Sequence, residues 1–302
     1  MVSGAGLALR LEPLDRLTIA YVAALGLALA WLWRDGLPAS WHWIVLAHGL
    51  LVALALLAPA ARTAGPLGRF LGDWYPLLLL GALYGALGVI NLEEAHAYDL
   101  TVQRWEAAVF GRQVSAEWIR AAPSPLLSWV MHACYLAYYP ILYAAPLGLW
   151  LSGRRDAARA TILALMVTFY ACYVAFVLFP VTGPRYMFPL ADNAAPQTAP
   201  ALLAQWLLNQ GDSWGAAFPS SHVAGCAVAA VMAWRAWRPL GLALLPFAAG
   251  LSVAVVYGQF HYAVDALGSL GWAAVVLLAF RRTPSVPGVR QGQLPATARV
   301  MP

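Results

Sequence analysis

Long apolar stretches separated by short polar segments run through most of the 302-residue chain. A helix needs about 20 apolar residues to cross the hydrocarbon core of a bilayer. Eight stretches approach that length, at residues 17–33, 41–58, 75–90, 126–151, 160–179, 219–237, 239–257 and 261–280. The pattern therefore predicts an all-α, polytopic transmembrane helical bundle with about eight spans. Pro38, Pro59 and Pro239 are expected in loops between the spans.

The composition favours a membrane protein over a soluble protein with a large core. Hydrophobic residues make up 62% of the chain and charged residues 10%, whereas soluble domains contain roughly 45–50% and 25%. The formal net charge of +5 does not indicate nucleic-acid binding, because the basic residues, all arginines, are scattered between the spans. Cys134, Cys172 and Cys226 fall inside apolar stretches, where we interpret them as small hydrophobic residues.

The arginines predict the orientation of the chain. With the N-terminus inside and eight spans, thirteen arginines face the inside and five face the outside, as the positive-inside rule expects. The inner set is Arg10, Arg16, Arg62, Arg69, Arg154, Arg155, Arg159, Arg235, Arg238, Arg281, Arg282, Arg290 and Arg299, and the outer set is Arg34, Arg104, Arg112, Arg120 and Arg185. The first apolar stretch lacks a clear cleavage site, so we expect it to be retained as a span. We therefore expect an integral protein of a membrane such as the bacterial inner membrane, with both termini cytoplasmic.

Three regions are expected along the chain. Residues 1–90 hold additional N-terminal spans, residues 91–282 hold the polar motifs, and residues 283–302 form a tail rich in Pro, Gly, Gln and Arg that we expect to be disordered. Within the second region two outer segments are long, at residues 91–125 and 180–218. The stretch 100–110 mixes charged residues with Leu, Val, Trp and Phe, which predicts a helix in the membrane interface.

Two short polar strings carry the candidate chemistry, Pro219-Ser220-Ser221-His222 and His261-Tyr262-Ala263-Val264-Asp265. Each begins a predicted span, and the orientation places both on the outer side. A histidine is costly to bury in hydrocarbon, so two histidines at matching span ends indicate a shared site. His261 and Asp265 are four residues apart, so we expect both side chains on one face of a helix. The carboxylate could then hold one imidazole nitrogen as N–H and leave the other free to attack.

The first string is expected to start a helix, with proline in the first turn and serine as a cap. The start of a helix favours anions, so a phosphate oxygen could rest beside His222. The alternatives are an ordinary helix cap for the first string and a solvated interfacial pair for His261 and Asp265. The occurrence of both strings on one side favours a functional site.

Both strings resemble motifs of the type 2 phosphatidic acid phosphatase superfamily. Its second motif is Pro-Ser-Gly-His, and its third is Ser-Arg followed by His and, four residues later, Asp. The chain is most similar to the branch that contains inositol phosphorylceramide synthases, which tolerates another residue in place of glycine, here Ser221, and favours His-Tyr, here His261-Tyr262. Weaker similarity extends over residues 99–111 and 179–185. The resemblance covers about residues 95–280 and implies a six-helix phosphatase-like core.

The resemblance also implies a role for each matching residue. His261 would be the nucleophile that takes up the phosphoryl group, and Asp265 would orient it. His222 would be the general acid that protonates the leaving oxygen. Ser220 and the backbone around Ser221 would help to hold the phosphate. The substrate would be a phosphorylated lipid in the bilayer, and the chemistry would need no metal or other cofactor.

The chain departs from the superfamily at its phosphate-binding cations. Ala254-Val255 stands where the third motif has Ser-Arg, and Leu178 stands where a lysine is expected, seven residues before Arg185. Arg185 is therefore the candidate phosphate-binding guanidinium, with an interfacial arginine that meets lipid headgroups as the alternative. Arg104 and Arg112, in the other outer segment, are the candidates to replace the missing charge. Loss of two cations is expected to weaken phosphate binding.

Two further groups of polar residues have plainer interpretations. Glu93, His96 and Asp99 have the spacing of one helical face, which would suit a metal site, but a solvated helix surface is the preferred interpretation. His132 lies within the fourth predicted span, where we expect a hydrogen-bonded packing residue.

The predicted activity is cleavage of a phosphoester or diphosphate bond at the outer membrane face through a phosphohistidine. With water as acceptor the enzyme would be a lipid phosphatase, and with an alcohol such as ceramide it would be a phosphotransferase. One alternative is transfer of a phospho-headgroup to a lipid alcohol, as in inositol phosphorylceramide synthases. Another is a non-catalytic lipid-binding or transport protein, which the missing cations favour and the intact His222, His261 and Asp265 oppose.

Overall fold

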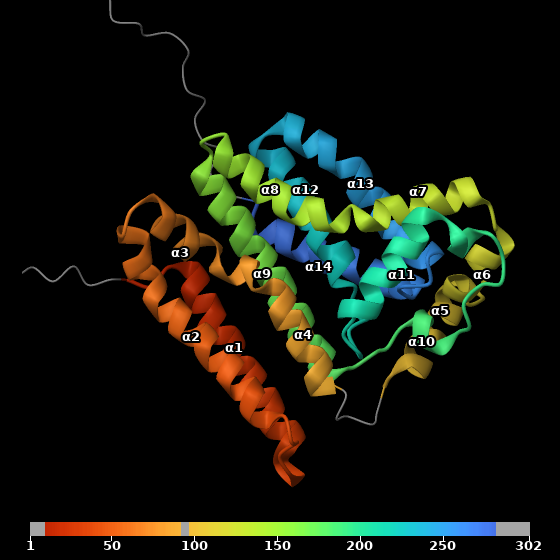
Figure 1. Cartoon of the computed structure of the whole chain (residues 1–302), viewed down its shortest axis with the longest axis horizontal. Coiled ribbons are helices and arrows are strands. Elements are labelled where there is room, and N and C mark those ends of the chain that lie inside the picture. Colours follow the sequence, from red (N-terminus) through yellow and green to blue (C-terminus); the bar gives the residue numbers. More distant parts are fainter. Residues whose placement is uncertain (1–9, 92–96, 282–302) are drawn as a thin grey trace, which may run out of the picture.

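The structure is a computed structural model that describes residues 10–91 and 97–281, and its regular elements are helices (Figure 1). The helices that correspond to predicted spans are α1 (Pro13–Leu32), α2 (Trp41–Thr63), α3 (Pro66–Leu78), α4 (Leu80–Asn91), α7 (Pro125–Leu136), α8 (Tyr138–Leu151), α9 (Arg155–Leu178), α12 (Ser221–Ala236), α13 (Arg238–Tyr257) and α14 (Ala263–Ala279). The others are α5 (Asp99–Phe110), α6 (Val114–Ala121), α10 (Pro184–Met187), α11 (Ala199–Gly211) and the 3-10 turns η1 (Trp33–Asp35) and η2 (Ala195–Gln197). The predicted all-α polytopic bundle is confirmed.

Each of the eight predicted spans has a helical counterpart. Five helical segments in the described part of the chain are long and apolar enough to cross a membrane: 13–35, 41–63, 66–91, 155–178 and 238–257. A sixth consists of α7 and α8, which meet at a bend of 42°. The remaining two predicted spans correspond to α12 and α14, which are shorter, with 16 and 17 residues. The protein is therefore an integral membrane protein.

Two of the three prolines expected in loops lie in helices instead. Pro59 is buried inside α2, and Pro239 lies in the first turn of α13. The first turn needs no backbone N–H donor, so Pro239 costs little there. Membrane helices tolerate an internal proline such as Pro59 because neighbouring groups can satisfy the freed carbonyl.

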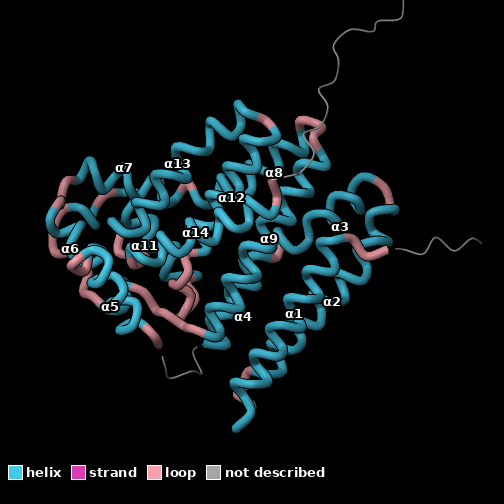
Figure 2. The backbone as a smooth tube through the Cα atoms, turned by 180° about the vertical axis from the view of Figure 1, so that it is seen from behind, coloured by secondary structure: helices cyan, strands magenta, loops and turns pink. Residues whose placement is uncertain are grey.

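Helix α12 lies at the centre of the bundle and packs against α8, α9, α13 and α14 (Figure 2). Small residues along α12 permit close approach. A Cβ atom on Gly225 would lie 2.6 Å from the ring of Phe169 on α9, a distance at which one side must shift. Small residues are the usual means of close helix packing in membranes. This packing fixes the position of the first turn of α12, which carries His222.

Helices α1 and α2 lie side by side along one flank of the bundle, and α3 follows them (Figure 1). A cluster of ion pairs at one end joins these helices to α9. Arg62 contacts Asp15 at 2.6 Å and Asp73 at 2.9 Å, and Arg159 of α9 contacts Glu12 and lies 3.5 Å from Asp73. The N-terminal spans are thus attached to the rest of the chain by buried charge as well as by apolar packing.

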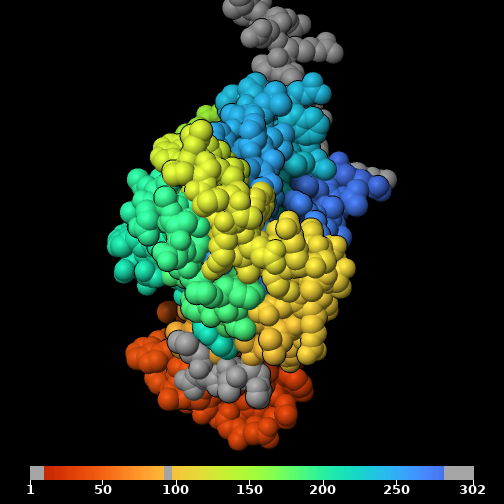
Figure 3. All heavy atoms as spheres, turned by 90° about the vertical axis from the view of Figure 1, so that its right-hand side faces the viewer, coloured from red at the N-terminus to blue at the C-terminus, as the bar shows by residue number. Residues whose placement is uncertain are grey.

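The described parts of the two long segments predicted to lie outside, residues 97–125 and 180–218, form an end of the molecule. Figure 3 faces this end, where α5 and α7 (yellow to yellow-green) adjoin the segment around α10 and α11 (green). The helix predicted at residues 100–110 is present as α5. The predicted tail at 283–302, like Glu93 and His96, lies outside the described residues.

Candidate active site

Two loop segments run side by side at the centre of the site and form an isolated parallel bridge. Val181 N–H donates to the carbonyl of Gly215 at 3.0 Å, and Ala217 N–H donates to the carbonyl of Val181 at 2.8 Å. Gly215 has a φ of 82°, and a Cβ there would lie 2.6 Å from the side-chain amide of Asn91, so glycine is required. The bridge ties the segment before Arg185 to the segment before His222.

The first polar string forms the cap and first turn of α12. Ser220 is the N-cap residue, and its Oγ accepts from the backbone N–H of Val223 at 3.4 Å. The helix begins at Ser221, so Pro219 lies before the cap and not in the first turn as the sequence suggested. Ser220 and Ser221 are both buried. The fold therefore places two hydroxyl groups and His222 at the start of one helix.

The proton on His261 is located by its hydrogen bonds. Nδ1 of His261 lies 2.9 Å from the carbonyl oxygen of Ala217 and 3.5 Å from Oδ2 of Asp265. A carbonyl oxygen can only accept, so Nδ1 carries the proton and Nε2 keeps its lone pair. The side chain is 5% exposed. This tautomer is the one that a nucleophilic imidazole requires.

The geometric reason for the His261–Asp265 contact differs from the one expected. His261 lies before α14, Tyr262 is the N-cap residue, and Asp265 is the third residue of the helix. The two side chains therefore do not share a helical face. Oδ2 of Asp265 accepts from the backbone N–H of Tyr262 at 2.8 Å. This capping interaction holds the carboxylate beside the residue that precedes the cap.

The structure brings the two imidazoles together. The ring centroids of His222 and His261 are 5.8 Å apart, with 57° between the planes, so one phosphoryl group can contact both. We call the small cavity that they line the histidine pocket; Arg185 and Asp212 line it too. The other side of His222 faces aromatic residues, with the ring of Tyr138 at 4.2 Å. Nδ1 of His222 is buried and has no hydrogen-bond partner among the described residues.

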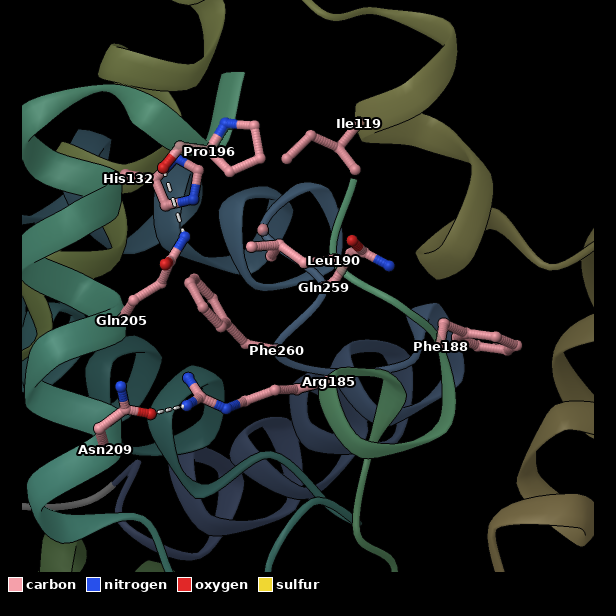
Figure 4. A pocket seen from close by; sticks show the side chains of 11 residues that line it. Ile119, His132, Arg185, Phe188, Leu190, Pro196, Gln205, Asn209, Gln259 and Phe260 are labelled. Atoms are coloured by element: carbon pink, nitrogen blue, oxygen red, sulfur yellow. Dashed lines mark hydrogen bonds between the residues drawn. The ribbon is translucent and has the colours of Figure 1, made fainter. Parts of the chain in front are cut away.

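Two larger cavities adjoin the histidine pocket. The first, which we call the apolar chamber, has a volume of about 360 Å³ and reaches Ser221 and His222. Its remaining walls include Leu80, Tyr138, Leu142, Tyr173 and Leu208. The second, which we call the amide-lined cavity, has a volume of about 260 Å³ and includes His132, Gln205, Asn209 and Gln259 (Figure 4). Arg185 and Phe260 line both the amide-lined cavity and the histidine pocket.

Arg185 supplies the basic side chain in the described lining of the histidine pocket. It lies on the short helix α10 and donates a hydrogen bond to Oδ1 of Asn209 on α11 (Figure 4). The residues lining the pocket do not include Arg104 or Arg112. Arg112 instead contacts Glu117, 3.7 Å away on the exposed surface. Neither arginine therefore takes the place of the missing cations in this arrangement.

Two buried carboxylates of α5 organise the site and were not anticipated as site residues. Asp99 accepts from the backbone N–H groups of Thr182 (2.9 Å) and Gly183 (2.8 Å) and from the phenol of Tyr262 (3.0 Å). Asp99 is 2% exposed, so the expected solvated helix surface is wrong at this residue. Glu106, fully buried, accepts from the N–H of Ala263 at 3.0 Å. The sequence signal that could have identified these two carboxylates is their seven-residue spacing, which places them on one helical face.

Of the three residues considered for a metal site, only Asp99 is described. Within residues 10–91 and 97–281, no group of three His, Cys, Asp or Glu side chains could hold a metal ion. Asp99 has the backbone partners given above, while Glu93 and His96 lie outside the described residues. His132 is a buried packing residue, as expected, and its Nδ1 lies 2.8 Å from the carbonyl of Ser128. Its ring also lines the amide-lined cavity.

The chain matches the family model described as the PAP2 superfamily over residues 100–280, a range that contains both histidine strings, Arg185 and Glu106 of α5. No curated protein and no solved structure matches the chain.

Proposed function

Because the chain belongs to the PAP2 superfamily, we propose that it is a membrane lipid phosphatase or phosphotransferase that cleaves a phosphoester or diphosphate bond through a phosphohistidine. Members of that superfamily are phosphoesterases and phosphotransferases. The single observation that carries the proposal is the pairing of His222 and His261, 5.8 Å apart, with the proton of His261 held on Nδ1.

In the first step Nε2 of His261 attacks phosphorus with its lone pair, and the bond from phosphorus to the leaving oxygen breaks. Protonated His222 gives its proton to that oxygen. The phosphorylated imidazole of His261 becomes positively charged, and the Asp265 carboxylate 3.5 Å from Nδ1 stabilises this charge.

In the second step neutral His222 takes a proton from the acceptor hydroxyl, and the acceptor oxygen attacks phosphorus. The phosphorus–nitrogen bond breaks, and its electron pair returns to Nε2 of His261. Ser220, Ser221 and Arg185 bind the phosphoryl oxygens: Arg185 lines the histidine pocket, Ser221 lines the apolar chamber, and Ser220 is the buried cap residue beside Ser221. The apolar chamber beside His222 takes the lipid chains. The distribution of arginines supports a site on the outer face of the membrane.

The test is turnover of a panel of phosphorylated lipids by the purified protein in detergent. His261→Ala is expected to lower the rate at least about a hundredfold, while size-exclusion chromatography shows an unchanged fold. His42→Ala, an exposed histidine on α2, is the matched control. Equal turnover by His261→Ala would remove this residue from the mechanism.

Transfer to an alcohol, as in the inositol phosphorylceramide synthase-like branch, is the second candidate. The amide-lined cavity favours it, because Gln259 is 3% exposed and neither polar atom of its amide has a hydrogen-bond partner in the described protein. A hydroxyl-bearing acceptor would satisfy that amide. Product analysis with and without added lipid alcohols separates the two: a new phospholipid indicates transfer, and release of the free phosphorylated product indicates hydrolysis. Binding of lipid without any turnover would indicate the third possibility, a non-catalytic lipid-binding or transport protein.

A further inference from the structure

Asp212 is a carboxylate in the histidine pocket to which the proposed chemistry assigns no task. It follows the last residue of α11 and lines both the histidine pocket and the apolar chamber. Two phenols fix its orientation: Tyr84 of α4 donates to Oδ1 at 3.1 Å, and Tyr186 of α10 donates to Oδ2 at 3.0 Å. Burial and the nearby Asp212 carboxylate raise the pKa of Tyr186 to about 12, so this phenol keeps its proton. The carboxylate is thus held in place between two cavities that a lipid substrate must occupy.

The charge of the histidine pocket is unusual for a site that receives phosphate. Its described lining contains one guanidinium, Arg185, and one carboxylate, Asp212. At the two positions where the superfamily motifs have a lysine and a second arginine, this chain has Leu178 and Val255. The fixed charges of Arg185 and Asp212 therefore cancel. A dianionic group placed there would meet one attractive and one repulsive charge in a partly desolvated space, where such interactions are strong.

We propose that Asp212 makes the site selective for phosphodiesters, which carry one negative charge, over phosphomonoesters, which carry two near neutral pH. This inference rests on the proposed function, because it names the substrate class of the same site. A phosphodiester monoanion brings one negative charge, which Arg185 attracts, and its second ester group replaces the charged oxygen that Asp212 would repel. A phosphomonoester places a second negative charge beside that carboxylate, and like charges brought together in this way are disfavoured.

The direct test compares two lipids with identical acyl chains, phosphatidic acid and phosphatidylmethanol, which differ in one methyl group and one charge. The purified full-length protein is expected to consume phosphatidylmethanol with a kcat/KM at least about tenfold above that for phosphatidic acid at pH 8. Asp212→Asn is expected to raise kcat/KM for phosphatidic acid by about tenfold and to leave that for phosphatidylmethanol nearly unchanged. Asp192→Asn removes an exposed carboxylate from the same outer segment and is the matched control. An unchanged ratio in Asp212→Asn overturns the proposal.

A second arm uses the unaltered protein. The second pKa of a phosphomonoester is about 6, so the wild-type preference for phosphatidylmethanol is expected to shrink between about pH 8 and pH 5. The titratable groups that lie around Asp212 are Tyr84, Tyr135, Tyr139, Tyr186, Arg185, His222 and His261. Titration of these groups alters turnover of both lipids, and the ratio of the two kcat/KM values isolates the charge of the substrate. A ratio that is constant over this range contradicts the proposal.

The failure of this inference can be told apart from failure of the proposed function. His261→Ala abolishes turnover of both lipids if the proposed function holds, whatever Asp212 does. If the wild-type protein turns over neither lipid, the proposed function fails, and binding still decides the role of Asp212. The concentration of each lipid that half-maximally raises Tm is then measured. A preference for phosphatidylmethanol that is lost in Asp212→Asn supports the charge selection, and equal preferences refute it.

Discussion

The Nδ1 proton of His261 is shared between a backbone carbonyl, on Ala217, and the Asp265 carboxylate. In Asp265→Asn the carbonyl still accepts this proton, so the ring keeps its orientation. In the proposed mechanism, this variant lacks the negative charge that stabilises the phosphorylated imidazole. We expect kcat to fall about 10²–10⁴-fold with little change in KM, as for loss of a charge that acts mainly in the transition state.

Steady-state kinetics of the two purified proteins checks this prediction. Asp35→Asn, which alters a surface carboxylate with 86% of its side chain exposed, serves as the control. A rise in KM with unchanged kcat would instead place Asp265 in substrate binding.

At the scale of residues, the sequence identifies the polar side chains that are costly to bury in a membrane. It does not identify all the side chains that line the site around them. His222, His261 and Asp265 stand out because ionisable side chains in membrane spans are costly to bury and usually serve a function. Asp212 could not be assigned from sequence, because its partners are phenols that come from distant segments. No local pattern contains that information.

At the scale of elements, the loop before Arg185 depends on a glycine in close contact. Gly183 has a φ of 94°, and a Cβ there would lie 3.2 Å from both Cβ of Ala217 and the carbonyl oxygen of Phe260. Gly111 has a φ of 72° with open space around it. Both Gly→Ala variants carry the backbone penalty of positive φ. Only Gly183→Ala adds a steric conflict next to the catalytic segments.

We therefore expect Gly183→Ala to lower the free energy of unfolding by about 1–3 kcal/mol more than Gly111→Ala, and to lower kcat/KM as well. Unfolding in mixed detergent micelles and kinetics on both variants test this. Equal stabilities would show that the contact with Ala217 and Phe260 is easily relieved.

The helices themselves were predictable because the apolar runs are long, whereas their ends were not. The sequence placed Pro219 in the first turn of α12 and His261 in the first turn of α14, but both residues lie before their helices. The ends follow capping by Ser220 and by Asp265, which only the folded backbone reveals. The contact between His261 and Asp265 was therefore expected for a different geometric reason.

For the whole molecule, the ion-pair cluster at one end of α1, α2, α3 and α9 is expected to hold the N-terminal spans in place. Arg62→Met removes the guanidinium that contacts Asp15 and Asp73. Because two buried carboxylates lose a partner, we expect a loss of about 3–5 kcal/mol in the free energy of unfolding. Arg69→Met on α3 changes an exposed arginine and is the control. Comparable losses in the two variants would mean that the cluster contributes no specific stability.

The orientation of the whole chain is tested by labelling. With the native cysteines silent, an impermeant thiol reagent added from outside is expected to label Asp192→Cys, in the outer segment, and to spare Arg69→Cys, on the opposite side. Both positions are exposed. Labelling of Arg69→Cys alone would invert the topology and move the site to the inner face.

The most direct test of the catalytic account is to trap the covalent intermediate. The purified protein is mixed with a lipid labelled with ³²P at its phosphorus, quenched within the first turnover, digested and mapped. We expect an alkali-stable, acid-labile label on the peptide that contains His261, and no such label in His261→Ala. A label on another residue, or full turnover by His261→Ala, would contradict the catalytic account.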